Sequence, residues 1–243
     1  MFVRIVMFLA LAFSGLGKSQ LTAPVATQNV QAILHSQVSA YSLKADDFAH
    51  ALISLSARFN LPMGIEWVRS PETTKRFNLS WSDTSVEQML KTLVESQPGY
   101  QFEISDGIVH VFPSSINSSA QNFLNFKIDK FELRNQVVET ASHKLRDLVR
   151  LRVSPPKSAT DHGAGVGYSQ AANIGDPEFS MALENVSVRQ VLDSLATASN
   201  KKIWVVTFVS SKDVTPTGYL RTITLRNDTG VPDSEQPVWD MFG

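Results

Sequence analysis

Cysteine is absent from this chain of 243 residues, and so are several motifs that mark enzyme active sites. Without cysteine there is no disulfide and no thiolate ligand or nucleophile, so burial alone must stabilise the fold. The chain also has no Gly-x-Ser-x-Gly stretch of a serine hydrolase and no His-Glu-x-x-His zinc motif. We therefore expect a protein that is not an enzyme, with no catalytic residue, no cofactor and no bound metal.

A surplus of positive charge is also lacking. The chain holds 22 Lys and Arg against 23 Asp and Glu, which gives a formal net charge of -1. A dedicated nucleic-acid binder is expected to show a basic face or stripe that neutralises phosphates. The composition therefore predicts no nucleic-acid partner.

Histidine and glycine give little indication of a site. The five histidines (His35, His50, His110, His143 and His162) are scattered along the sequence. A site hypothesis needs convergent neighbours, so we interpret His50 and His110 as surface residues. The glycine-rich stretch at 161–167 follows no strand with a nucleotide-binding motif and opens no helix, which favours a surface loop.

The first residues carry few charges and a short apolar run, Ile5 to Leu16. A helix that spans a bilayer needs about 20 apolar residues, so this run is too short to cross comfortably. It predicts a signal peptide over residues 1–19, with an uncleaved membrane anchor as the alternative. An exported chain without cysteine fits the bacterial periplasm better than an animal extracellular space.

One stretch of the sequence occurs twice. FNLSWSDTSVEQMLKTL at 77–93 aligns without a gap on FSMALENVSVRQVLDSL at 179–195. Both copies alternate apolar and polar residues and then change to helical spacing, which predicts a strand followed by a helix. We expect Asp83 or Thr84 to cap the first helix, with Thr84 and Glu87 as a capping box, and Asn185 to cap the second.

The flanking sequence extends each copy into a larger unit. In the first unit, 41–113, Asp46 and Asp47 precede a helix that should end near Asn60, and Asp106-Gly107 should form a hairpin turn. The second unit, 124–226, repeats this order and adds a long loop at 155–176. Residues 20–40 and 114–123 are predicted linkers, and 227–243 an irregular tail. The expected fold class is α+β: two tandem β-α-β-β-α-β-β units, with helices packed on one face of a small mixed sheet.

The first unit resembles the secretin and TonB N-terminal short domain. The matching features are the strand at Tyr41 to Leu43, Ala49-x-Ala51-Leu52, the exit at Leu61, Ser85-Val86-Glu87-x-x-Leu90 and the Gly107 hairpin. The match covers 41–112 well and 126–225 weakly. The resemblance implies a periplasmic module of a Gram-negative bacterium that binds partner proteins without enzymatic activity. Because no barrel or pore sequence follows, we expect a stand-alone exported protein.

Together these observations predict a protein-binding module of the periplasm. Its partners would be envelope proteins of the outer membrane or of a secretion, uptake or signalling complex, or a second copy, and the membrane would be contacted only through an uncleaved signal segment. We assign as interaction residues Trp67 and Trp239, which suit a sheet edge and a tail, and Ile108 and His110 on the returning hairpin arm. The alternative is an enzyme or small-ligand binder whose site lies between the two units, closed by the loop at 155–176.

Overall fold

The computed structural model describes residues 25–69, 73–114, 122–153, 177–200, 202–209 and 220–226. The expected signal peptide, the loop at 155–176 and the tail at 227–243 lie outside these residues. The fold class is α+β, as predicted. In chain order the elements are α1 (Val25–Leu34), β1 (Gln37–Ala45), α2 (Phe48–Phe59), β2 (Met63–Arg69), β3 (Phe77–Ser85), α3 (Val86–Glu95), β4 (Tyr100–Ser105), β5 (Ile108–Pro113), η1 (Phe123–Asn125), β6 (Lys127–Gln136), α5 (Val138–Val153), β7 (Phe179–Ser187), α6 (Val188–Ala198), β8 (Ile203–Val209) and β9 (Leu220–Arg226).

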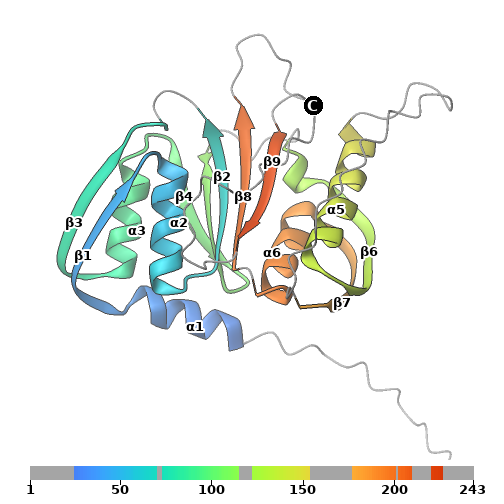
Figure 1. The fold of residues 1–243 in the computed structure, drawn as a ribbon, viewed down its shortest axis with the longest axis horizontal. Helices are drawn as coiled ribbons and strands as arrows, with labels where there is room; N and C mark the ends of the chain where they lie inside the picture. The colour runs from blue at the N-terminus through green and yellow to red at the C-terminus, as the bar shows by residue number, and fades with distance from the viewer. Residues whose placement is uncertain are drawn as a thin grey trace, which may run out of the picture.

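The two sequence units share one central sheet. Its five strands lie in the order β4-β5-β2-β8-β9, and β2 of the first unit pairs in parallel with β8 of the second from Met63↔Ile203 to Arg69↔Val209. The remaining strands form two antiparallel pairs, β1 with β3 and β6 with β7. Figure 1 shows the central sheet between these two pairs. The units are therefore joined through backbone hydrogen bonds.

Helices cover both faces of the central sheet. On β2, the side chains of Met63 and Ile65 join a core built with α2 and α3. The intervening positions face the other way, and Val68 packs against the core of the second unit, which contains α5 and α6. Successive side chains of a strand point to opposite faces, which explains why one strand serves two cores. The helices of each unit lie on one face of this sheet, and the sheet has helices on both faces because its strands come from both units (Figure 1).

The repeated sequence folds into the same strand and helix in both units. Strands β3 and β7 end at Ser85 and Ser187, and these serines are the N-caps of α3 and α6. The predicted caps Asp83, Thr84 and Asn185 were wrong, because the strands continue past them. Asp83 and Asn185 instead adopt left-handed backbone, with φ of 46° and 53°. Asp and Asn tolerate this conformation better than most residues, so the two positions match in structure as in sequence.

Other local predictions in the first unit are confirmed. The side chain of Asp47 accepts the backbone N–H of His50 at the start of α2, and Asn60 ends that helix with a φ of 57°. Asp106 and Gly107 both have positive φ and join β4 to β5. Two such residues match a type I′ turn, whose twist suits a two-residue hairpin.

The predicted linker at 20–40 contains regular structure. Helix α1 spans Val25–Leu34, and β1 begins at Gln37. Val30 and Leu34 are buried in the first core. The linker prediction was therefore wrong from residue 25 onward, since two apolar side chains attach this segment to the first unit. In the part of the chain that the structure describes, no helix is long and apolar enough to cross a bilayer.

Candidate functional site

A buried ion pair connects the two units. Glu66 projects from β2 with 1% exposure, and its Oε1 accepts from Nε of Arg189 on α6 at 3.1 Å and also from Nη2. Asn122 donates to the other carboxylate oxygen of Glu66 at 3.2 Å, and Arg189 donates from Nη1 to Asn125 at 3.0 Å. The side chains of Glu66 and Arg189 thus connect β2, α6 and the segment around η1 through an ion pair and hydrogen bonds.

Burial dominates the electrostatics of Glu66. Removal from water raises its pKa above the ordinary value, although Arg189 and the hydrogen bonds from Arg189 and Asn122 act in the opposite direction. Burial likewise raises the pKa of the Tyr100 hydroxyl, to about 12. The oxygen of this hydroxyl accepts the backbone N–H of Val68 on β2 at 2.9 Å. Both polar groups hold β2 in place.

A second buried cluster lies on the face of the central sheet that carries Glu66, at the level of Gly64 on β2. Oδ1 of Asp193 on α6 accepts from Nε1 of Trp204 at 2.7 Å and lies 2.9 Å from Nε2 of His110. Gly64 lies between the two rings in the sheet register, opposite His110 on β5 and Trp204 on β8. A Cβ at Gly64 would lie 2.3 Å from Cζ2 of Trp204, so only glycine allows the indole to lie across β2.

This arrangement favours a structural role for the His110–Asp193 pair. A general base must come within hydrogen-bond reach of a substrate proton, yet Trp204, His110 and Asp193 are all buried. Among the described residues, no group of three or more His, Asp or Glu side chains is placed to hold a metal ion. The cluster fixes α6 to the shared sheet.

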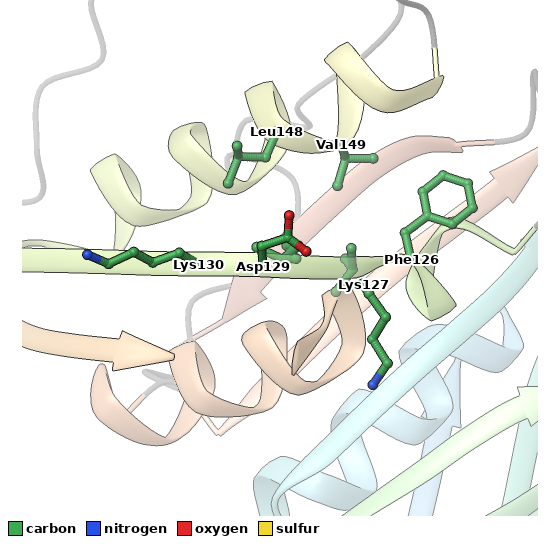
Figure 2. Close-up of a pocket in the computed structure, with 8 residues that line it drawn as sticks. Phe126, Lys127, Asp129, Lys130, Leu148 and Val149 are labelled. Atoms are coloured by element: carbon green, nitrogen blue, oxygen red, sulfur yellow. The ribbon is translucent and has the colours of Figure 1, made fainter. Parts of the chain in front are cut away.

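An open cavity of about 350 Å³ lies between β6 and α5. Figure 2 shows Leu148 and Val149 of α5 facing Asp129 on β6, while the side chains of Lys127 and Lys130 extend in different directions. The ammonium group of Lys130 pairs with Glu132 at 2.8 Å. Every lining residue belongs to the second unit, so the cavity does not lie between the units.

The outer edge of β4 is a different kind of candidate site. Within the described ranges β4 pairs only with β5, so its other edge has no strand partner there. Its side chains alternate between half-buried Tyr100, Phe102 and Ile104 and exposed Gln101, Glu103 and Ser105. Such an edge offers unpaired backbone N–H and C=O groups to another extended chain.

The structure places three of the four predicted interaction residues in the interior. Trp67, Ile108 and His110 are 9%, 4% and 3% exposed, which leaves little of them for a partner to contact, and Trp239 lies outside the described residues. The predicted surface position of His110 was wrong, because Asp193 and Trp204 enclose its ring. His50 is partly exposed and contacts Asp47 at 2.7 Å.

The sequence interpretation missed Glu66, Arg189 and Asp193. A signal was present at Glu66, a charge in the middle of an otherwise apolar strand, Met63 to Val68. A buried charge requires a partner. Its partner lies 123 residues further along the chain, where no local pattern points back to β2.

Comparisons with known proteins do not assign the chain to a family. No protein-family model matches it, and no curated protein matches it significantly.

Proposed function

We propose that this chain is a non-catalytic protein-protein interaction module of the periplasm, associated with the outer membrane or with a secretion, uptake or signalling complex. The observation that carries this proposal is the outer edge of β4, which has no strand partner among the described residues, on a scaffold whose sequence contains a repeat. Extended segments commonly bind such edges through main-chain hydrogen bonds. The polar side chains that could form a reactive site, Glu66, His110 and Asp193, are instead bound to neighbours in the interior.

Two features of the sequence support the cellular context. The apolar run at Ile5 to Leu16 has the length of a signal peptide. The first unit resembles the secretin and TonB N-terminal short domain, whose members bind partner proteins. The mass of the protein purified from its native host tests the export step, since removal of about 19 residues is expected, and an intact Met1 would contradict cleavage.

Cross-linking in intact cells, followed by mass spectrometry, tests the interaction itself. We expect reproducible cross-links to one or a few envelope proteins. Recovery of the chain as a monomer without reproducible neighbours would contradict the proposal.

The cavity between β6 and α5 favours a second candidate function, the binding of a small ligand. Its volume of about 350 Å³ is at the lower end for ligand sites. Substituting Leu148→Trp would fill it, and deleting Ala159 to Ala172 would remove most of the loop that the sequence predicts at 155–176. A ligand binder should lose its ligand in either variant while staying folded, whereas an interaction module should keep its partners in both.

A further inference from the structure

Strands β4 and β8 occupy equivalent places in the two units. Each follows the helix of the repeated sequence, α3 or α6, and each is the first arm of an antiparallel hairpin, β4–β5 or β8–β9. Phe102 and Ile104 of β4 pack against the core of the first unit, as Trp204 and Val206 of β8 do in the second. The two strands therefore present equivalent outer edges.

The two edges differ in what pairs with them. The outer edge of β8 receives β2 in parallel over seven register pairs. The outer edge of β4 has no such strand in the described part of the chain. The fold thus shows that an edge of this kind accepts a parallel strand, whereas no strand among the described residues pairs with the outer edge of β4.

The hairpin register identifies the backbone groups at that open edge. Ser105 and Ile108 flank the two-residue turn, and Ser114 donates to the carbonyl of Gly99 at 2.8 Å further along. Hydrogen-bonded pairs alternate along an antiparallel ladder, so Gln101, Glu103 and Ser105 direct their backbone groups toward β5. Phe102 and Ile104 direct theirs outward.

Side-chain chemistry indicates what kind of occupant fits. On β8 the residues that face away from α6 are Ile203 and Val205, which are 2% and 7% exposed beneath the helices of the first unit. The corresponding face of β4 carries Gln101, Glu103 and Ser105, all exposed. A second copy docking as the two units dock here would cover that face and desolvate Glu103. A single extended strand would leave it in water.

We propose that the outer edge of β4 binds one extended segment of a partner protein, parallel to β4, with apolar side chains beside Phe102 and Ile104 and a basic side chain beside Glu103. This assignment rests on the proposed interaction function and specifies its site. Cross-strand apolar pairs and opposite charges each stabilise a sheet modestly, so main-chain hydrogen bonds supply much of the affinity and the side chains select the register.

Two variants of one residue test the assignment in the full chain. Ile104→Pro removes an outward N–H. It removes no bond to β5, because the backbone groups of Ile104 point away from that strand. Proline is tolerated at such edge positions. Ile104→Ala makes a similar loss of side chain but keeps the N–H, and is the matched control. The probe is a fluorescent peptide of about nine residues, in which valine and lysine alternate, matching the alternation of a strand; a valine-glutamate peptide is its charge control.

Fluorescence anisotropy should show that Ile104→Pro binds the valine-lysine peptide at least about tenfold more weakly than Ile104→Ala, which corresponds to about 1.4 kcal/mol. The valine-glutamate peptide should bind the unmodified chain more weakly than the valine-lysine peptide, because of Glu103. The amides of Phe102 and Ile104 should become protected from hydrogen exchange only with peptide bound. Equal binding by both variants, or no binding by the unmodified chain, would overturn the assignment.

Cross-linking of the Ile104→Pro chain in cells separates this inference from the function. Loss of the cross-links in that variant, with retention in Ile104→Ala, supports the edge of β4. Unchanged cross-links in both variants would leave an interaction module but place its site elsewhere. Absence of cross-links from the unmodified chain would count against the function itself.

Discussion

At the scale of single residues, the carboxylate of Glu66 depends on one cation. Glu66 is 1% exposed, and Arg189 is the charged group that pairs with it. Substituting Arg189→Met should destabilise the protein by about 3–5 kcal/mol, because removing one partner leaves a buried charge uncompensated. Urea unfolding followed by circular dichroism measures this change.

Two controls separate the lost pairing from the lost side chain. Arg134 pairs with Glu132 at an exposed site, where neighbouring cations lower the pKa of Glu132 to about 2. Arg134→Met should change stability little, since exposed pairs are screened by solvent. The double variant Glu66→Gln, Arg189→Met should recover part of the loss. No recovery would mean that packing, rather than charge, explains the effect.

The pH dependence of stability should also report on Glu66. Its pKa is raised in the folded protein above the ordinary value of 4.5, so between these values the folded state holds more protons than the unfolded state. The stabilisation that Glu66 contributes is therefore complete below about pH 4.5 and is lost as the pH rises through the pKa of Glu66 in the folded protein. Glu66→Gln should remove this part of the pH dependence of stability.

Urea titrations of the unmodified chain and Glu66→Gln from about pH 4.5 to 8 check the sign. The stability of the variant relative to the unmodified chain should increase with pH. A relative stability that falls as the pH rises would show that Arg189 outweighs burial and lowers the pKa of Glu66.

At this scale, sequence patterns predicted the residues whose conformation is decided locally. Asp47, Asn60 and the Asp106-Gly107 turn are confirmed because each depends on its immediate backbone. The pairings of Glu66 with Arg189 and of His110 with Asp193 depend on two strands and a helix meeting across the molecule, and no single segment encodes them.

At the scale of elements, the start of α6 shows why a cap is difficult to choose from sequence. Ser187 accepts the N–H of Gln190 at 3.2 Å, and the side chain of Gln190 accepts the N–H of Ser187 at 2.9 Å, which forms a capping box. Asn185 was an equally good candidate by residue type. The choice depends on where β7 ends, and its pairing with β6 continues to Ser187.

Substitutions at these two positions should therefore have different effects. Ser187→Ala should cost about 1 kcal/mol, as loss of an N-cap does. Asn185→Gly should be neutral to within about 0.5 kcal/mol, because glycine readily adopts the positive φ of this position. Chemical unfolding of each variant provides the comparison. A larger loss for Asn185→Gly than for Ser187→Ala would mean that Asn185 is the cap.

The composition of the segment that forms helix α1 did not indicate a helix. The polar, Gln-rich segment before Tyr41 lacks a strong apolar stripe, yet Val30 and Leu34 are buried in the first core. Two apolar contacts made by tertiary packing outweigh the local preference of the segment. Repeats and turns could thus be predicted here, whereas an element stabilised mainly by its neighbours could not.

At the scale of the whole molecule, duplication predicted two units but not the sheet that joins them. Strand β2 lies between β5 of its own unit and β8 of the other, and its two faces serve two cores. The apolar residues on both faces of β8 were consistent with this burial, since parallel strands covered on both sides read as continuous apolar runs. The identity of the neighbouring strand required the fold.

Because the sheet is shared, we expect the two units to fold and unfold together. A fragment that starts at Asn122 would lose β2 beside Ile203 and Val205, and Arg189 would lose Glu66. Such a fragment should lack a cooperative urea transition when expressed alone, since it exposes the apolar surface that β2 covers and removes the carboxylate that binds Arg189. In the intact chain, circular dichroism and tryptophan fluorescence should give coincident transitions.

Cleavage of the full chain between the units provides the sharper test, because it breaks no contact in the shared sheet. With a protease site inserted at 115–121, the two fragments should remain associated after cutting and elute together at the mass of the intact chain. Adding Arg189→Met should promote their separation, since it removes the buried pairing that links α6 to β2. Fragments that separate while each keeps its own cooperative transition would show that the units are independent domains and that the β2–β8 pairing contributes little to stability.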